Sequence, residues 1–236
     1  FIPSFLFQTE HYFDLTGGVS YLCTVGLALI AYPGMDARGT LLCFMVAIWS
    51  ARLGTFLFLR VKRAGQDRRF NEIKKKFFRF AFTWTLGGGW VFITMAAALA
   101  AITSEQQQAL GILAYLGTLV WLVGFGIEVV ADQQKTNFRK DPANAEQFIT
   151  TGLWSKSRHP NYFGEIVLWF GVALIALPAL SGWQLVTLIS PLFVTFLLIK
   201  VSGVHMLEEG AQKRWGKDPS YQQYVASTPV LVPKLV

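Results

Sequence analysis

Charged residues and cysteines are both scarce in this chain. Only 15% of its 236 residues are charged, whereas 53% are hydrophobic, and soluble domains carry roughly 25% charged residues. The two cysteines, Cys23 and Cys43, lie inside apolar runs and are interpreted as small apolar residues. Two cysteines placed in this way define neither a disulfide framework nor a metal site, so the composition excludes a small domain stabilised by disulfides.

Several motifs with a known chemical role are also missing. The sequence contains no G-x-G-x-x-G after a strand pattern, no P-loop, no H-E-x-x-H and no G-x-S-x-G. These absences exclude the common soluble nucleotide-binding and hydrolase motifs, and we expect no bound metal. No internal inverted repeat is visible, which disfavours a transporter.

Long apolar runs dominate what is present. A helix needs about 20 apolar residues to cross a bilayer, and its backbone satisfies its own hydrogen bonds there. We therefore predict an all-α integral membrane protein with six or seven transmembrane helices, as a single domain over residues 1–236. The expected spans are residues 17–32, 40–59, 77–102, 109–131, 163–180 and 183–204, with a tail at 205–236 and the end of a seventh helix at 1–7. Within the third span, the triplet Gly87–Gly89 indicates a packing or kink site.

Basic residues alternate between the connecting segments. Most Lys and Arg lie in the loops at residues 60–79 and 132–162 and in the C-terminal tail, while the other loops hold only Arg38. Because cytoplasmic loops carry an excess of Lys and Arg, we predict that the basic loops and both termini face the cytoplasm. The net charge of +7 is then a topology signal with attraction to anionic membrane lipids, and we expect no nucleic-acid partner.

A dense polar string, RHPNYFGE at residues 158–165, comes directly before the fifth span. Pro160 and Asn161 favour a helix start, whose free N–H groups and positive dipole suit an anion such as phosphate. Arg158 and His159 add donors, and Glu165, one turn further, requires a donor such as a ribose or an amide. The alternative is an ordinary interfacial cap with snorkelling Arg and Tyr side chains.

Other polar residues lie within or beside the apolar runs. Arg52 is in the middle of the second span, which predicts either a polar internal site or a structural pair with a carboxylate such as Glu128. A row of charged residues is spaced by three or four positions in the fourth helix, so its members share one helical face. This row predicts either a functional site or a salt-bridged helix end. Its members are Glu128, Asp132, Lys135 and Arg139.

Together these strings resemble the steroid 5α-reductase superfamily, and within it the bacterial DUF1295-type membrane reductases. The resemblance rests on G-L-W followed by RHPNYFGE at 152–165, ADQQK-x-x-FR at 131–139, WSARLG at 49–54, GQDRRF at 65–70, and the tail from Glu208-Glu209 to Pro233. It covers about residues 14–233. Sterol reductases and isoprenylcysteine carboxyl methyltransferases are relatives of the same group.

The resemblance implies a reductase of the bacterial inner membrane, with helices around one cavity for cofactor and substrate. NADPH would enter from the cytoplasm and a hydrophobic lipid or steroid from the bilayer. Arg139 or Lys140 would serve the 2′-phosphate. The residues carried over as NADPH contacts are Asp132, Lys135, Arg139, Arg158, His159, Asn161, Tyr162, Glu165, Glu209, Tyr221 and Tyr224.

The implied reaction is NADPH-dependent reduction of a carbon–carbon double bond conjugated to a carbonyl, on a 3-oxo-Δ4-steroid-like lipid. Steroid 5α-reductases proper use a Gln-Glu pair and a Tyr to polarise the ketone, and this sequence departs from that pattern, with Trp49 near the place of the Tyr. The catalytic candidates are therefore Tyr12, His11 and a protonated Asp14, with Arg52 as an electrostatic partner.

Two alternatives from other classes stay open. An S-adenosylmethionine-dependent isoprenylcysteine-type carboxyl methyltransferase would share the His-Pro-x-Tyr and Glu-Glu features, although the segment from Asp132 to Arg139 favours the reductase. A non-enzymatic membrane lipid-binding protein would tolerate loss of Asn161 and Glu165.

Overall fold

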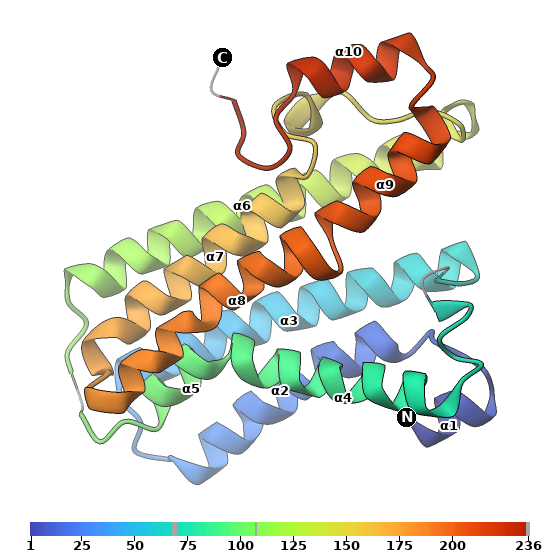
Figure 1. Cartoon of the computed structure of the whole chain (residues 1–236). Coiled ribbons are helices and arrows are strands. Elements are labelled where there is room, and N and C mark those ends of the chain that lie inside the picture. Colours follow the sequence, from blue (N-terminus) through green and yellow to red (C-terminus); the bar gives the residue numbers. More distant parts are fainter. Residues whose placement is uncertain (68–69, 107, 235–236) are drawn as a thin grey trace. The chain divides into compact units, whose positions relative to one another are not determined.

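The computed structural model describes residues 1–67, 70–106 and 108–234. Arg68 and Arg69 of the predicted basic loop, and Gln107 of a predicted outer loop, lie outside the described residues. Within those ranges every regular element is a helix (Figure 1). The structure thus confirms the predicted all-α class.

Among the residues that the structure describes, five helical segments are long and apolar enough to cross a membrane, and a bent pair provides a sixth. The five are α2 (Phe13–Ala31), α3 (Ala37–Ala64), α6 (Ile112–Lys140), α7 (Pro160–Ala176) continued by η4 (Leu177–Ala179), and the composite run Gly182–Trp215. The bent pair is α4 (Phe77–Thr94) with α5 (Ala96–Ile102), at 52°. Residues 1–7 contain α1 (Ile2–Leu6), which is too short to cross a bilayer alone.

The outer faces of these helices carry large apolar side chains. Ile30, Phe44 and Phe92 are exposed by 79%, 64% and 68%. A membrane solvates large apolar side chains of this kind with its lipid, and these side chains lie on helices that are long and apolar enough to span it. The chain is therefore an integral membrane protein.

The chain forms two compact units, which we describe separately. Unit 1 comprises residues 1–110 and 176–187, and unit 2 comprises residues 111–175 and 188–236. That residues 1–236 act as one reductase domain stays a prediction.

In unit 1, α2 and α3 pack closely because two glycines face each other. A Cβ added to Gly18 would lie 3.1 Å from the Cα of Gly54. Beside this contact, the rings of Tyr21 and Trp49 meet edge to face at 5.0 Å. Gly87 of α4 packs on the ring of Phe13, with a Cβ position 3.2 Å from the ring. The prediction of a packing site at Gly87 is thus confirmed, while the bend lies at Met95.

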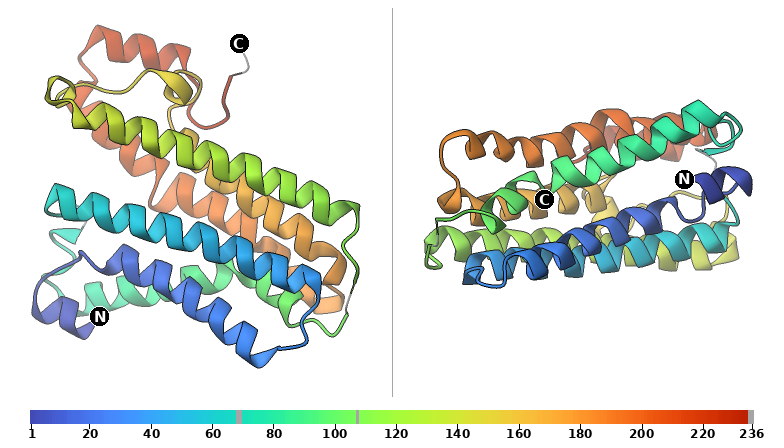
Figure 2. Two further views of the ribbon diagram at one scale, coloured as in Figure 1. Left: turned by 180° about the vertical axis from the view of Figure 1, so that it is seen from behind. Right: turned by 90° about the horizontal axis from the view of Figure 1, so that it is seen from below.

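In unit 2, α6 and α7 run side by side (Figure 2) and approach at two glycine pairs. A Cβ on Gly124 would lie 2.5 Å from the Leu168 nitrogen and 2.6 Å from the Gly164 oxygen. A Cβ on Gly117 would lie 2.7 Å from the Gly171 oxygen. The glycines on each helix are seven residues apart, so they share one face, and small residues let membrane helices approach this closely.

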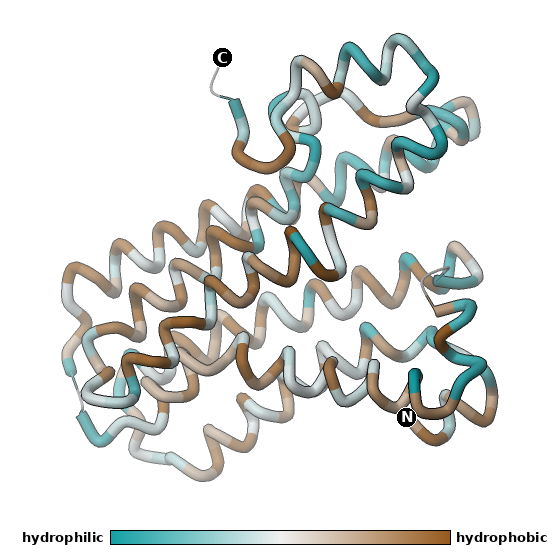
Figure 3. The backbone as a smooth tube through the Cα atoms, in the orientation of Figure 1, coloured by the Kyte–Doolittle hydropathy of each residue, from teal (hydrophilic) through white to brown (hydrophobic). Residues whose placement is uncertain are grey.

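The remaining elements of unit 2 are η2 (Pro142–Asn144), η3 (Gly152–Ser155), α8 (Ser190–Phe196), the π-helix η6 (Leu197–Val201), α9 (Val204–Trp215) and α10 (Pro219–Ser227); η5 (Gly182–Ile189) precedes α8. Figure 3 shows that hydrophilic residues concentrate in α9 and α10, while α7 and α8 are largely hydrophobic. The sixth predicted span is thus not a uniform α-helix, because 3₁₀ and π segments flank α8 and a break at Ser202–Gly203 precedes α9.

Candidate functional site

The start of α7 in unit 2 brings an arginine, a histidine and a carboxylate together. Nη1 of Arg158 lies 2.6 Å from Oε2 of Glu208, and Nε2 of His159 lies 2.6 Å from Oε1 of the same carboxylate. The side chains of Arg158 and His159 are only 10% and 7% exposed. One carboxylate from α9 therefore engages both basic residues at the N-terminus of α7.

The segment before α7 is held by the C-terminal tail. The Arg158 N–H donates to the Pro229 carbonyl at 2.9 Å, and the Lys234 N–H donates to the Lys156 carbonyl at 3.0 Å. The Ser157 hydroxyl donates to the Leu231 carbonyl at 2.7 Å. The tail thus runs along residues 156–158 and fixes the backbone that presents Arg158 and His159.

The break before α9 explains how Glu208 reaches α7. Gly203 has φ −113° and ψ −105°, so the helix is interrupted there before α9 begins. A Cβ at Gly203 would collide with the Leu198 carbonyl and lie 3.0 Å from Cε2 of Tyr162. Glycine therefore allows α9 to begin against the first turn of α7, and Glu208 follows within that helix.

Trp154 connects η3 with α6 and α10. Its indole N–H donates to the Ala131 carbonyl at 3.0 Å, and its own carbonyl accepts the Tyr224 hydroxyl at 2.6 Å. Nζ of Lys135 lies 4.5 Å from the centre of the indole ring, a cation–π contact. Burial raises the pKa of Tyr224, so this hydroxyl stays a donor.

The loop before Trp154 adopts a conformation that glycine favours. Gly152 has φ +62°, and a Cβ there would lie 2.5 Å from the Gln134 side chain. Oε1 of Gln134 accepts the Leu153 N–H at 2.9 Å. The positive φ therefore favours glycine at position 152, and the close approach of the Gln134 side chain adds to this preference.

The predicted row on α6 separates into buried and exposed members. Glu128 and Asp132 are buried, at 2% and 4% exposure, Lys135 is half-buried, and Arg139 is exposed. Arg139 donates from Nη1 to the Asn144 and Ala145 carbonyls at 3.3 and 3.2 Å. The helical spacing thus placed the residues on α6 as expected, and their role toward a nucleotide stays a prediction.

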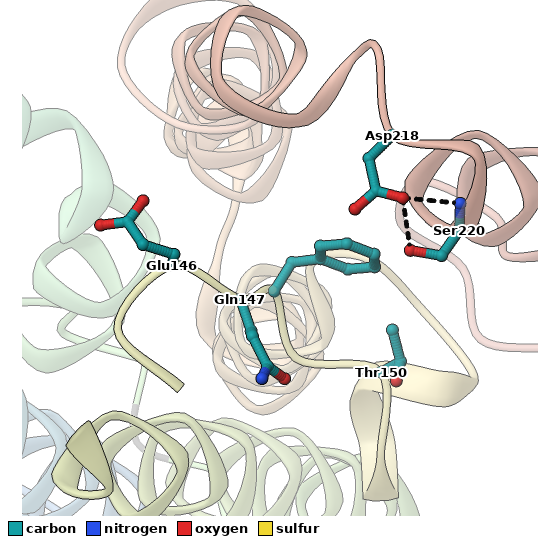
Figure 4. A pocket seen from close by; sticks show the side chains of 6 residues that line it. Glu146, Gln147, Thr150, Asp218 and Ser220 are labelled. Carbon is teal, nitrogen blue, oxygen red and sulfur yellow. Dashed lines mark hydrogen bonds between the residues drawn. The ribbon is translucent and has the colours of Figure 1, made fainter. Parts of the chain in front are cut away.

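A second polar cluster lies at the far end of α9. Arg214 donates to Oε2 of Glu146 and to the Ala145 carbonyl, each at 2.8 Å, and the Trp215 indole donates to the Glu146 carbonyl at 2.6 Å. Beside it is a pocket of about 420 Å³ (Figure 4), whose lining residues include Glu146, Phe148 and Asp218. Asp218 caps α10 by accepting from the amide and hydroxyl of Ser220.

The other predicted cofactor residues vary in their surroundings. The ring of Tyr162 stacks on that of His159 at 5.8 Å and 10°, and Glu165 is half-buried in the next turn. Tyr221 is buried against Phe148, with ring centres 5.1 Å apart. Glu209 is exposed and pairs with His205 at 3.2 Å.

The four catalytic candidates all lie in unit 1. Nε2 of His11 is 2.8 Å from the Gly65 carbonyl oxygen. Tyr12 is 53% exposed and stacks on Phe58. Asp14 pairs with Arg60 at 3.9 Å, and the Arg52 guanidinium lies 5.0 Å over the Phe56 ring. Their assignment to catalysis stays a prediction.

Glu208 is the residue of this site that the sequence prediction missed. The prediction selected the neighbouring Glu209 instead. A signal existed, because a buried Arg-His pair requires a carboxylate partner. Two adjacent glutamates on one helix point in different directions, however, and only the position of α9 decides between them.

A helical membrane protein with a polar, cation-containing helix start is the class that these features define. The chain belongs to the family described as "Protein of unknown function (DUF1295)", whose model matches residues 1–228. This agrees with the predicted place in the steroid 5α-reductase superfamily.

Curated relatives give weaker, partial matches. "3-oxo-5-alpha-steroid 4-dehydrogenase 1" of Rattus norvegicus is 28% identical over 117 residues, covering 50% of this chain and 40% of the relative. "Delta(14)-sterol reductase TM7SF2" of Mus musculus is 32% identical over 77 residues, 27% of this chain and 18% of the relative. "Uncharacterized protein C594.04c" of Schizosaccharomyces pombe is 21% identical over 187 residues, 66% of this chain and 54% of the relative. The chain therefore spans about half or less of these relatives, and no solved structure matches it.

Proposed function

We propose that this protein is a membrane reductase that uses NADPH to reduce a carbon–carbon double bond conjugated to a carbonyl in a hydrophobic lipid. The observation that carries the proposal is the cluster at the start of α7, with Arg158 and His159 on Glu208 and Lys135 on Trp154. The names of the partially matching relatives, a steroid dehydrogenase and a sterol reductase, support the reaction class. The substrate class is a 3-oxo-Δ4-steroid or a similar enone lipid that enters from the bilayer.

The residues of unit 2 fit a dinucleotide phosphate. The N-terminus of α7 carries the positive end of a helix dipole, which stabilises an anion. Lys135 adds a cation for the phosphates, and three covered polar atoms at this helix start have unused hydrogen-bonding capacity for the neutral groups of the nucleotide. His159 Nδ1, Arg158 Nε and Asn161 Oδ1 have no hydrogen-bond partner among residues 1–67, 70–106 and 108–234.

Bound NADPH would supply the hydride that adds to the β-carbon of the enone. The chain has to polarise the carbonyl oxygen and deliver a proton, so that the developing enolate charge is stabilised. Tyr12, His11 and Asp14 are the proposed donors, with Arg52 as the proposed electrostatic partner. The positive end of α7 and Lys135 hold and orient the phosphates, and the apolar helices exclude water from the reacting atoms.

NADPH oxidation by the purified, detergent-solubilised protein tests this function. We expect NADPH absorbance to fall when a Δ4-3-ketosteroid or another lipid with an enone or enoyl group is added, and the reduced lipid to appear by mass spectrometry. Consumption with none of these lipids would contradict the reaction class. Thermal stabilisation by S-adenosylmethionine, and none by NADPH, would instead support the methyltransferase.

Binding variants sharpen the test. We expect Lys135→Ala to raise the Kd for NADPH about tenfold or more, because a charge-assisted contact is worth roughly 1.5–3 kcal/mol. Glu105→Gln changes an exposed carboxylate of unit 1 and serves as the control with unchanged Kd. Equal affinities in Lys135→Ala and the wild type would remove Lys135 from the site.

A further inference from the structure

The two ring nitrogens of His159 have different environments. Nε2 lies 2.6 Å from a carboxylate oxygen of Glu208, while Nδ1 is covered and lacks a hydrogen-bond partner in the described part of the chain. A carboxylate only accepts, so Nε2 carries the hydrogen, and Nδ1 of the neutral ring is then an acceptor. A covered acceptor without a partner is rare in folded proteins and requires a cause.

The surroundings of His159 favour the neutral ring. Burial lowers its pKa and outweighs the hydrogen bond and charge of Glu208, which raise the pKa. The charges of Lys135 and Arg158 lower it further. At neutral pH the ring is therefore neutral and Nδ1 keeps its lone pair.

Two further covered polar atoms at this helix start also lack a hydrogen-bond partner among the described residues. Arg158 Nε is a donor and Asn161 Oδ1 an acceptor, and neither has a hydrogen-bond partner within the residues that the structure describes. Together with His159 Nδ1, the turn offers two acceptors and one donor. A phosphate only accepts hydrogen bonds, whereas a carboxamide or a ribose hydroxyl both donates and accepts, so the latter groups match the turn better.

On this basis, and resting on the proposed binding of NADPH, we propose that His159 Nδ1 accepts a hydrogen bond from a neutral N–H or O–H group of the nucleotide. Glu208 is the positioning residue, because its carboxylate holds the hydrogen on Nε2 and so keeps Nδ1 available. Nδ1 is bonded to the ring carbon next to Cβ, so it lies close to the backbone where α7 begins. In this arrangement Lys135 and the positive end of the α7 dipole bind the phosphates.

Nucleotide analogues that each lack one donor test the proposal. The panel is NADPH, its 3-acetylpyridine analogue without the carboxamide N–H, its hypoxanthine analogue without the adenine amino group, and its deoxyribose analogues. We expect the wild type to bind one analogue about fivefold or more weakly than NADPH. His159→Phe keeps a ring to stack on Tyr162 but lacks the acceptor, so it should bind NADPH and that analogue equally.

Three glutamate variants test which residue positions the His159 ring. We expect Glu208→Gln to reduce the discrimination several-fold, because an amide can either donate to or accept from Nε2 and no longer fixes the hydrogen. Glu105→Gln is the control that retains full discrimination. The assignment to Glu208 would be wrong if Glu209→Gln abolished the discrimination and Glu208→Gln preserved it.

The position of the hydrogen is measurable without nucleotide. The chain has three histidines, so nitrogen-15 spectra with His159→Phe assign the His159 signals. We expect a protonated Nε2 and a bare Nδ1 in the wild type, and a mixture of tautomers in Glu208→Gln.

These measurements separate the inference from the proposed function. Wild-type ratios for every analogue in His159→Phe would overturn the contact, even if NADPH binds and is oxidised. Absence of NADPH binding to the wild type would contradict the proposed function and with it the nucleotide contact. A hydrogen found on Nδ1 would overturn the role of Glu208 in either case.

Discussion

Glu10, between α1 and α2, is a carboxylate kept charged within unit 1. Its side chain is 1% exposed and accepts from Nζ of Lys74 at 2.6 Å and from the Asp67 N–H at 2.8 Å. Burial by itself raises the pKa of Glu10, but the hydrogen bonds from Lys74 and Asp67 and the charge of Lys74 bring it below its ordinary value. The pair therefore ties the turn before α2 to the segment before α4.

The lowered pKa of Glu10 predicts a pH-dependent contribution to stability. A carboxyl group with a depressed pKa in the folded state stabilises the fold above its unfolded pKa, and the contribution is lost as pH falls through the folded value. At neutral pH we expect Glu10→Gln to lower the free energy of unfolding by about 2 kcal/mol, because Lys74 loses its charged partner. In acid, below the folded pKa, wild type and variant should unfold at the same temperature.

Thermal unfolding in detergent, followed by tryptophan fluorescence across pH, checks this. Glu72→Gln is the control, since Glu72 is 75% exposed and pairs with Lys75 on the surface, where such pairs contribute little. A Glu10→Gln effect that stayed constant down to acid pH would contradict the ion-pair explanation.

At the scale of elements, the close crossing of α6 and α7 leaves no room for side chains at Gly124 and Gly164. A Cβ added to either glycine would meet backbone atoms of the facing helix. Backbone atoms cannot move aside by a change of rotamer, as a side chain can. The sequence contains these glycines at matching spacing, but their pairing across two helices depends on the tertiary arrangement.

A pair of alanine substitutions on α6 tests the crossing. We expect Gly124→Ala to lower the free energy of unfolding by about 1–3 kcal/mol, because overpacking forces the helices apart. Gly126→Ala is the matched control, since a Cβ there meets nothing within 4 Å and alanine favours a helix over glycine. The unfolding temperatures of both variants measure the difference, and equal destabilisation by the two would show that close approach is not the cause.

The bend between α4 and α5 shows where sequence patterns are insufficient. α4 continues through Gly87–Gly89, and the break falls at Met95, whose ψ is −6°. An α-helix requires ψ near −42°, so the helical geometry is interrupted at this residue, between two helices that lie at 52°. Neither Pro nor Gly marks the position, and no sequence pattern predicts it.

At the scale of the whole molecule, the arrangement of basic residues leads to a prediction about orientation. The segment that includes Lys74, Lys75 and Lys76 is basic, and the loop that includes Gln106 carries no Lys or Arg. We propose that the basic loops face the cytoplasm of a bacterial inner membrane. The compartment that holds NADPH would then be the one that faces the start of α7.

Single-cysteine labelling tests the orientation. In a background with Cys23 and Cys43 replaced by alanine, Glu72→Cys and Gln106→Cys each introduce one thiol at an exposed position. We expect an impermeant maleimide to label Gln106→Cys in spheroplasts, and to label Glu72→Cys only after lysis, because the bilayer blocks the reagent. The opposite pattern would reverse the predicted orientation of these loops.

The membrane class, the helical class and the start of α7 at Pro160 follow from the sequence by itself. These features depend on short-range properties, namely the length of apolar runs and the helix-starting preference of Pro and Asn. Similarly, the helical repeat placed Glu128 and Asp132 on α6 without knowledge of any other helix.

Only the tertiary structure decided which distant residues meet. Glu208 joins His159 across 49 residues, and Lys74 joins Glu10 across 64. A local sequence pattern cannot predict contacts between residues so far apart in the chain. The direction of a side chain on one helix identifies its partner only once the facing helix is placed. For the same reason the choice of Glu208 over Glu209 came from the placement of α9 against the start of α7, after the helix interruption at Gly203.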